Sequence, residues 1–168
     1  QGPKVIEFEK KLNSLCGSKY ACAVSSGTAA LHLAILSLGI KKNDYVITTP
    51  MTFLASANSI LYAGARPVFV DIHKKNYCID LEKLEKKLIE FRRKKRKIKA
   101  VIVTDYAGHV ADWNKIKRLS KKYKFFTIND NCHALGAKYK KDKKYACKFA
   151  DIVTQSFHPV KVITTGEG

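Results

Sequence analysis

The stretch "AVIVTDYAGHVADWNKIKRLSKKYKFFTIND", from Ala100 to Asp130, shows the alternation that decides the fold. It opens with an apolar run that ends in Asp105, and it closes with a second run that ends in Asp130. Between the runs Asp112 can cap an amphipathic helix. The inward-facing residues of that helix are Trp113, Ile116, Leu119 and Tyr123. Apolar strands joined by such a helix predict parallel pairing in a sheet that is covered on both faces.

The same alternation continues along the chain. Further strand-like runs are Tyr45–Thr49, Pro67–Asp71 and Asp151–Phe157, and helices are predicted from Pro3, Ser26 and Asp80. The helix from Ser26 is apolar nearly all round until Gly39, which predicts that it is buried. We find no linker and no internal repeat, so we predict one α/β domain with three layers (α/β/α) and a mostly parallel sheet.

Charge is the most unusual feature of the composition. The formal net charge is +18, and the densest basic run is Arg92–Lys99. Such a charge raises nucleic acid as a partner, so a nucleic-acid-binding protein on an enzyme fold stays open as an alternative. The run has no interleaved aromatic residues to stack on bases and lies at the end of a predicted helix, where cations are favoured. We therefore expect no specific nucleic-acid partner.

Cysteine usage and hydropathy exclude several classes of protein. The five cysteines show no CxxC spacing, which argues against a disulfide framework and against a zinc site. No apolar run is long enough to span a bilayer, and the sequence does not start like a signal peptide. We expect a cytoplasmic protein without a resident metal and without membrane insertion.

Candidate site residues gather where strands are predicted to end. Ligands of parallel sheets bind beyond the carboxyl ends of the strands, and Asp71, Asp105, Asp130 and Ser156 fall there. "SSGTAALH" adds a helix start at which Gly27 allows close approach and Thr28 offers a hydroxyl. That pattern fits an anion site or a plain helix cap, and it is neither a Walker loop nor GxGxxG.

Three further side chains suggest a chemistry. Asp130, in "NDNCHALGA", could be a cap or could pair with a cationic ring nitrogen, while His133 alone is more often structural. Lys161, in "SFHPVKVITTGEG", could attack a carbonyl if its amine were neutral. A phosphate-binding helix start, a strand-end aspartate and a lysine are the parts needed to hold pyridoxal phosphate.

Four blocks in this order resemble a known family: "SSGTAALHLA", "TTPMTFLASANSILYAGARPVFVDI", "NDNCHALGA" and "SFHPVKVITTGEG". Over essentially its whole length, the chain is similar to the catalytic-domain half of the DegT/DnrJ/EryC1/StrS nucleotide-sugar aminotransferases, which are fold type I pyridoxal-phosphate enzymes. The resemblance implies that Lys161 forms the Schiff base and moves the proton, and that Asp130 keeps the pyridine nitrogen protonated.

The resemblance also implies roles for the other site residues. Gly27, Thr28 and Ser156 match the positions that bind the cofactor phosphate. Phe53 matches the aromatic residue that stacks on the ring, and His133 fills a position near the ring hydroxyl. His158 belongs to a narrower pattern, and we expect it to face the sugar nucleotide.

The reaction that the resemblance implies transfers the amino group of L-glutamate to a UDP-linked 4-keto-6-deoxy sugar. "TDYAGHVADW" and "SFHPVK" most resemble the branch that serves pseudaminic acid biosynthesis, and another nucleotide-sugar 3- or 4-aminotransferase is the alternative. The dehydratase branch is disfavoured because its lysine is replaced by histidine, whereas Lys161 is present here.

Two departures from the family pattern bear on the expectations. Asn129 and Asn131 flank the key aspartate where many relatives have glutamate and a small residue. Family members also continue past Gly168, so we expect residues 1–168 to be an incomplete large domain without the small C-terminal domain. Relatives form homodimers, and we expect the chain alone to be poorly active.

Overall fold

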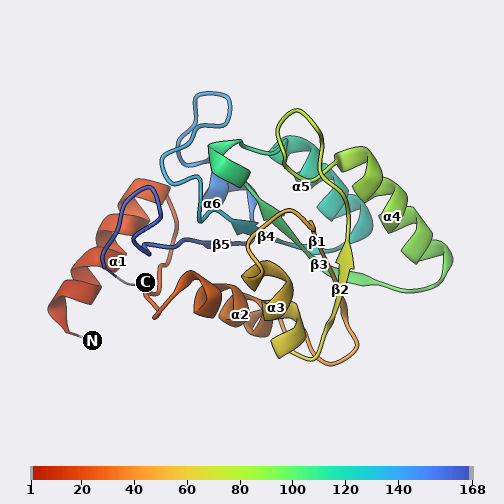
Figure 1. The fold of residues 1–168 in the computed structure, drawn as a ribbon, viewed down its shortest axis with the longest axis horizontal. Helices are drawn as coiled ribbons and strands as arrows, with labels where there is room; N and C mark the ends of the chain where they lie inside the picture. Colours follow the sequence, from red (N-terminus) through yellow and green to blue (C-terminus); the bar gives the residue numbers. More distant parts are fainter. Residues whose placement is uncertain (1, 167–168) are drawn as a thin grey trace.

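The computed structural model describes residues 2–166, and its strands form a single parallel sheet (Figure 1). Within this range the strands are β1 (Tyr45–Thr48), β2 (Arg66–Phe69), β3 (Ile98–Thr104), β4 (Phe126–Asp130) and β5 (Ile152–Thr154). Their order across the sheet is β2-β1-β3-β4-β5, and every pairing is parallel. The predicted parallel α/β architecture is confirmed.

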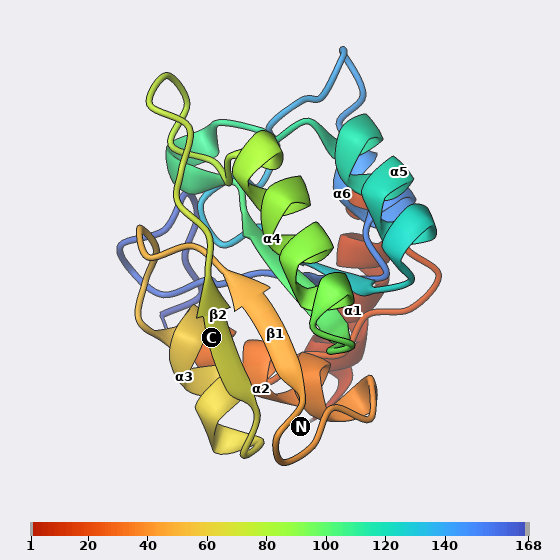
Figure 2. The same ribbon diagram turned by 90° about the vertical axis from the view of Figure 1, so that its right-hand side faces the viewer.

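Helices cover both faces of the sheet. They are α1 (Pro3–Cys16), α2 (Gly27–Ser37), α3 (Ala55–Tyr62), α4 (Leu81–Arg93), α5 (Trp113–Tyr123) and α6 (Tyr145–Phe149), with a short 3-10 turn, η1 (Tyr106–Gly108). Figures 1 and 2 show α2 and α3 on one side, α4, α5 and α6 on the other, and α1 beyond β5. The three predicted layers are therefore present.

Alternation along the strands divides the core into two parts. Ala100 and Ile102 of β3 join the cluster under α2 and α3, whereas Val101 and Val103 join the cluster under α4, α5 and α6. Successive side chains of a strand point to opposite faces, so a strand that is covered on both sides must be apolar throughout. This is the physical reason that the apolar runs in the sequence located the strands.

The helix caps follow the sequence closely. The Asp80 carboxylate accepts hydrogen bonds from the backbone of Glu82 and Lys83 at the start of α4. The Asp112 carboxylate accepts one from Lys115 at the start of α5. Both caps satisfy N–H groups that have no partner inside the helix, which fixes where these helices begin.

Two expectations about helices need correction. The α2 helix is buried only on the side that carries Leu31, Ala34 and Ile35, while Leu33 is 50% exposed and Leu36 is 45% exposed. The sequence predicted that this nearly all-apolar helix is buried. In the structure its outer face, with Leu33 and Leu36, is not covered by any element of residues 2–166. The α3 helix was not predicted, because the small residues of "ASANSILY" show no clear periodicity.

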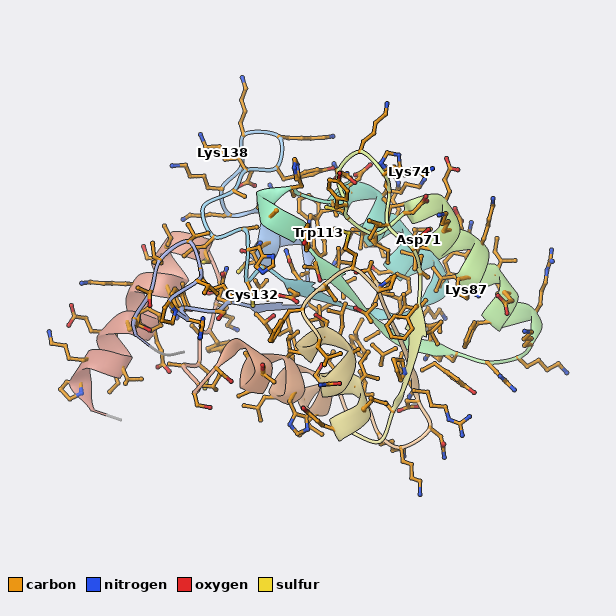
Figure 3. All side chains as sticks on the ribbon, in the orientation of Figure 1. Asp71, Lys74, Lys87, Trp113, Cys132 and Lys138 are labelled. Carbon is orange, nitrogen blue, oxygen red and sulfur yellow. The ribbon has the colours of Figure 1, made fainter. Side chains whose placement is uncertain are left out.

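The surface carries the expected excess of cations. Figure 3 shows the side chains of Lys74 and Lys138 extending away from the body of the protein. Among the helices of the described residues, none has the length and hydropathy needed to cross a membrane.

Candidate active site

The ends of three neighbouring strands define the candidate site. Register places Thr104 of β3 beside Asp130 of β4, and Asp130 beside Thr154 of β5. Asp130 is 4% exposed although it is an acidic residue at the end of its strand. An ionised carboxylate taken out of water needs donors or a cation, so its contacts indicate what the site can hold.

Hydroxyl and backbone groups surround the Asp130 carboxylate. Its Oδ2 accepts hydrogen bonds from Ser56 Oγ at 2.8 Å and from Thr104 Oγ1 at 3.5 Å. Its Oδ1 accepts a hydrogen bond from the backbone N–H of Cys132 at 3.3 Å. The Thr52 hydroxyl lies 3.2 Å from that of Ser56 and 3.1 Å from that of Thr104, which joins the donors in one chain. These contacts fix the orientation of the carboxylate.

Sequence reasoning did not identify the hydroxyls of Ser56 and Thr52 as part of the site. Ser56 lies in the unpredicted α3, and Ser56 and Asp130 are 74 positions apart in the chain. Thr52 stands in the loop before α3, inside the "MTFLASAN" segment that was singled out only for its aromatic residue. The several hydroxyl residues of that segment were the available signal.

The start of α2 is packed against the segment that follows β5. A Cβ atom added to Gly27 would lie 2.9 Å from Cβ of Ser156 and 3.3 Å from Sγ of Cys132. Real Cβ contacts are almost never this short, so glycine is what allows the approach. The N-cap Ser26 accepts a hydrogen bond from the backbone of Ala29 at 3.1 Å. The structure thus brings Gly27 and Ser156 together, with Thr28 in the first turn of the helix.

Lys161 and Phe53 meet across the site. The Nζ atom of Lys161 lies 5.9 Å from the centroid of the Phe53 ring, within the range of a cation–π contact. Phe53 is 65% exposed, so much of its side chain is open to a ligand. Lys161 is only partly exposed and is held in a turn in which its backbone N–H donates to the carbonyl of His158 at 2.9 Å.

Electrostatic effects connect Lys161 with the residues that follow Asp130. Burial lowers the pKa of His133, and the charge of Lys161 lowers it further, while Asp130 opposes the change. Burial raises the pKa of the Cys132 thiol, which keeps this thiol protonated at neutral pH. Lys161, Asp130 and His133 are thus close enough to influence one another.

Aromatic rings border the site on the side of His133. The rings of Tyr106 and His133 are 5.6 Å apart in an edge-to-face arrangement, and those of Tyr106 and Tyr77 are 6.4 Å apart. Neither tyrosine was predicted as a site residue. Tyr106 lies in η1 directly after β3, so its position beyond a strand end was the signal that could have identified it.

His158 lies at the edge of this group, and the side chains of the other strand-end aspartates, Asp71 and Asp105, lie apart from it. His158 is exposed in the turn before Lys161, and its Nδ1 accepts a hydrogen bond from the backbone of Val160 at 3.4 Å. Asp71 forms an exposed ion pair with Lys83 at 2.6 Å. Asp105 is completely buried, and its side chain faces the layer of α5 and α6. Proximity to a strand end was therefore not sufficient to identify a site residue.

A separate groove of about 1040 Å³ runs between α1, residues 18–24 and β5. Its walls are mostly apolar, and neither Lys161 nor Asp130 contributes to them. The chemistry of the candidate site depends on converging polar groups rather than on this hollow, so we place the site at the strand ends.

Comparison with known proteins identifies the family of this chain. The model of the DegT/DnrJ/EryC1/StrS aminotransferase family matches residues 1–168, so the chain belongs to this family. It is 47% identical over 167 residues to UDP-4-amino-4,6-dideoxy-N-acetyl-β-L-altrosamine transaminase of Campylobacter jejuni, covering 99% of this chain and 43% of that protein. It is 40% identical to GDP-perosamine synthase of Escherichia coli, covering 100% of this chain and 44% of that protein.

Solved structures share the fold. A DegT/DnrJ/EryC1/StrS aminotransferase from Brucella abortus matches with a TM-score of 0.92 and 32% identity, over 99% of this chain and 45% of that one. NtdA from Bacillus subtilis, solved with its bound cofactor PMP, matches with a TM-score of 0.88 and 32% identity, over 99% of this chain and 36% of that one. The chain spans less than half the length of these relatives.

Proposed function

We propose that this chain forms the cofactor-binding part of a pyridoxal-phosphate-dependent aminotransferase that acts on a nucleotide sugar. The observation that carries the proposal is the convergence at one rim of Lys161, the Phe53 ring, the buried Asp130 carboxylate and the Gly27–Ser156 approach. Membership in the aminotransferase family and the bound PMP of a structural neighbour support it. In this view residues 1–168 belong to the large domain of the enzyme.

The residues present fit the parts of the cofactor. The N-terminal end of α2, together with Thr28 and Ser156, suits a phosphate. The exposed ring of Phe53 suits the pyridine ring, and the buried Asp130 suits a cationic ring nitrogen, because the groups that donate hydrogen bonds to its carboxylate are two hydroxyls and a backbone N–H, all neutral. His133 would be the partner of the ring hydroxyl. When bound, the cofactor supplies an electron sink for the bond changes at the substrate carbon.

The protein's own residues supply binding and proton transfer. With its amine neutral, Lys161 Nζ would take the proton that leaves the α-carbon of the amino donor, and in the second half of the reaction it would deliver a proton to the carbon that receives the amino group. The hydroxyls of Ser56 and Thr104 hold the Asp130 carboxylate in the orientation in which it can accept from a ring N–H. Thr52 connects these two hydroxyls, so it supports the same orientation.

L-Glutamate as the amino donor and a UDP-linked 4-keto-6-deoxy sugar as the acceptor are the substrates that we propose, in a step of pseudaminic acid biosynthesis. The 47% identity to the Campylobacter jejuni transaminase supports this choice. The 40% identity to GDP-perosamine synthase supports the alternative, which is another nucleotide-sugar 3- or 4-aminotransferase of the family, here one with a GDP-linked acceptor. His158, exposed beside Lys161, is our candidate for contact with the sugar nucleotide.

A homodimer in the cytoplasm is part of the proposal. Large apolar side chains are exposed on the outer sides of α2 and α3: Leu33, Leu36, Leu61 and Tyr62. A second copy of the protein could cover this surface. Light scattering on the protein that carries this chain should then give twice the monomer mass, and a monomer at micromolar concentration would contradict this part of the proposal.

The substrate proposal can be tested with an acceptor panel. The protein is incubated with pyridoxal phosphate, L-glutamate and either a UDP-linked or a GDP-linked 4-keto-6-deoxy sugar, and amino sugar and 2-oxoglutarate are quantified by mass spectrometry. We expect both products in equal amounts with the UDP-linked acceptor. Product with the GDP-linked acceptor alone would favour the alternative, and 2-oxoglutarate from neither would refute the aminotransferase proposal.

A further inference from the structure

We propose that Asp105 is a positioning residue that holds Asp130 in place from the opposite face of the sheet. This inference rests on the proposed function, because Asp105 would not contact the cofactor and would act only by positioning Asp130, the proposed partner of the ring nitrogen. Asp105 follows β3 directly, and its backbone N–H donates to the carbonyl of Asp130 at 3.2 Å. The two aspartates are thus joined through the backbone, while their side chains lie on opposite faces.

Asp105 is the centre of a dense hydrogen-bond network. It is 0% exposed, and its carboxylate accepts from the backbone of Ala111 at 3.0 Å and from the Trp113 indole at 3.3 Å. It also accepts from the Tyr145 hydroxyl at 2.8 Å. Burial raises the pKa of Asp105, and these hydrogen bonds oppose the change. A buried carboxylate that is surrounded by donors is rigid, because losing any one contact leaves a polar group unpaired.

The network continues to both neighbours of Asp130. The side-chain N–H groups of Asn129 and Asn131 donate to Asp105 Oδ2 at 3.0 Å and 3.3 Å. Because successive residues of a strand point to opposite faces, holding Asn129 and Asn131 behind the sheet fixes the direction in which Asp130 projects in front of it. These are the two positions at which the sequence departs from the family pattern, and the structure gives them a shared partner.

A second arm of the network reaches the segment proposed to bind phosphate. Asn131 Nδ2 donates to the Tyr145 hydroxyl at 2.8 Å, and Asn131 Oδ1 accepts from Gln155 Nε2 at 2.7 Å. Gln155 directly precedes Ser156, which lies against Gly27. One network behind the sheet therefore connects the residue proposed for the ring nitrogen with the segment proposed for the phosphate.

The test is a double-mutant cycle that uses pyridoxal phosphate affinity as its readout. Dissociation constants are measured by absorbance titration for the wild type, Asp105→Asn, Asp130→Asn and the double variant, in the protein that carries this chain. We expect Asp105→Asn to weaken binding about tenfold in the wild-type background and to have almost no further effect once Asp130 is replaced. Residues that act through one another are not additive, so equal effects of Asp105→Asn in both backgrounds would overturn the inference.

A milder variant keeps the inference testable if Asp105→Asn does not fold. Tyr145→Phe removes a single hydroxyl from the network, and we expect a smaller loss of affinity that also disappears in the Asp130→Asn background. The thermal midpoints of the cofactor-free variants are recorded, and the cycle uses only variants that unfold cooperatively. Failure of the wild type to bind the cofactor would refute the proposed function, whereas binding with additive losses would refute only the role of Asp105.

Discussion

Replacing Gly27 with alanine should damage the candidate phosphate site through a steric conflict that the structure locates. The added Cβ would lie 2.9 Å from Ser156 Cβ, 3.3 Å from Cys132 Sγ and 3.4 Å from the Gln155 carbonyl oxygen. The nearest of these is a side-chain atom one bond from the backbone, so it cannot rotate away. Helix α2 or the segment after β5 must therefore move apart by several tenths of an ångström.

The magnitude follows from two opposing effects. Overpacking a well-packed site costs about 1–3 kcal/mol. Alanine gains about 0.5–1 kcal/mol over glycine within a helix, which reduces the loss at this first helical position. We expect the free energy of unfolding in urea to fall by about 1–2 kcal/mol, together with a loss of pyridoxal phosphate affinity of at least tenfold.

A second substitution makes this prediction specific. Ser156→Gly removes the Cβ that the new methyl group meets, so the double variant should recover part of the stability that Gly27→Ala loses. The measurement is a double-mutant cycle of unfolding free energies. An unchanged stability for Gly27→Ala, or a double variant whose losses simply add, would show that the close approach at Gly27 does not have the energetic cost that we infer.

Three further predictions use the same protein. Phe53→Leu removes an exposed ring, so it should weaken pyridoxal phosphate binding by a stacking term of about 0.5–1.5 kcal/mol in titration and leave the melting temperature almost unchanged. Burial lowers the pKa of His133, so below about pH 6.5 the unfolded state binds more protons than the folded state. The free energy of unfolding should therefore fall more steeply with decreasing pH in wild type than in His133→Gln. Urea unfolding of both proteins at pH 7.5 and pH 5.5 measures this difference. The hydrogen bond from Cys147 lowers the pKa of Cys16 to about 7, whereas burial raises the pKa of Cys78 to about 11. Brief iodoacetamide treatment at pH 7.5 should therefore label Cys16 before Cys78, as followed by peptide mass spectrometry. Labelling in the reverse order would contradict this assignment.

Much of the fold could be predicted because its strands and helix caps depend on residues that are close together in the sequence. Strands that are covered on both faces must be continuously apolar, which makes them visible in the sequence. The Asp112 cap and the periodic apolar face of α5 likewise involve residues that are close in sequence. The order of the strands has no such local signature, and neither does the side of α2 that remains uncovered. Helix α3 was missed because its small residues pack well without producing a periodic pattern.

The site was predictable only in part for a related reason. Gly27, Asp130 and Lys161 stand in short motifs whose chemistry can be read from residue type and position. Ser56 reaches Asp130 across 74 positions, and such a contact arises only from the tertiary fold. Asp105 shows a different limit, because a strand-end carboxylate suggests direct contact with a ligand, whereas its side chain is buried in the core and we infer that it acts only through Asp130.

The most direct test of the account compares absorbance spectra of wild type, Lys161→Ala and the matched surface variant Lys138→Ala with added pyridoxal phosphate, before and after L-glutamate. Figure 3 shows Lys138 directed to solvent, so its replacement controls for the loss of a lysine. We predict a protein-bound visible band in wild type and Lys138→Ala that changes with glutamate, and no such band in Lys161→Ala. Borohydride reduction followed by peptide mapping should place the cofactor on Lys161. Identical spectra for all three proteins, or a label on another lysine, would contradict the central claim that Lys161 is the residue that reacts with the cofactor.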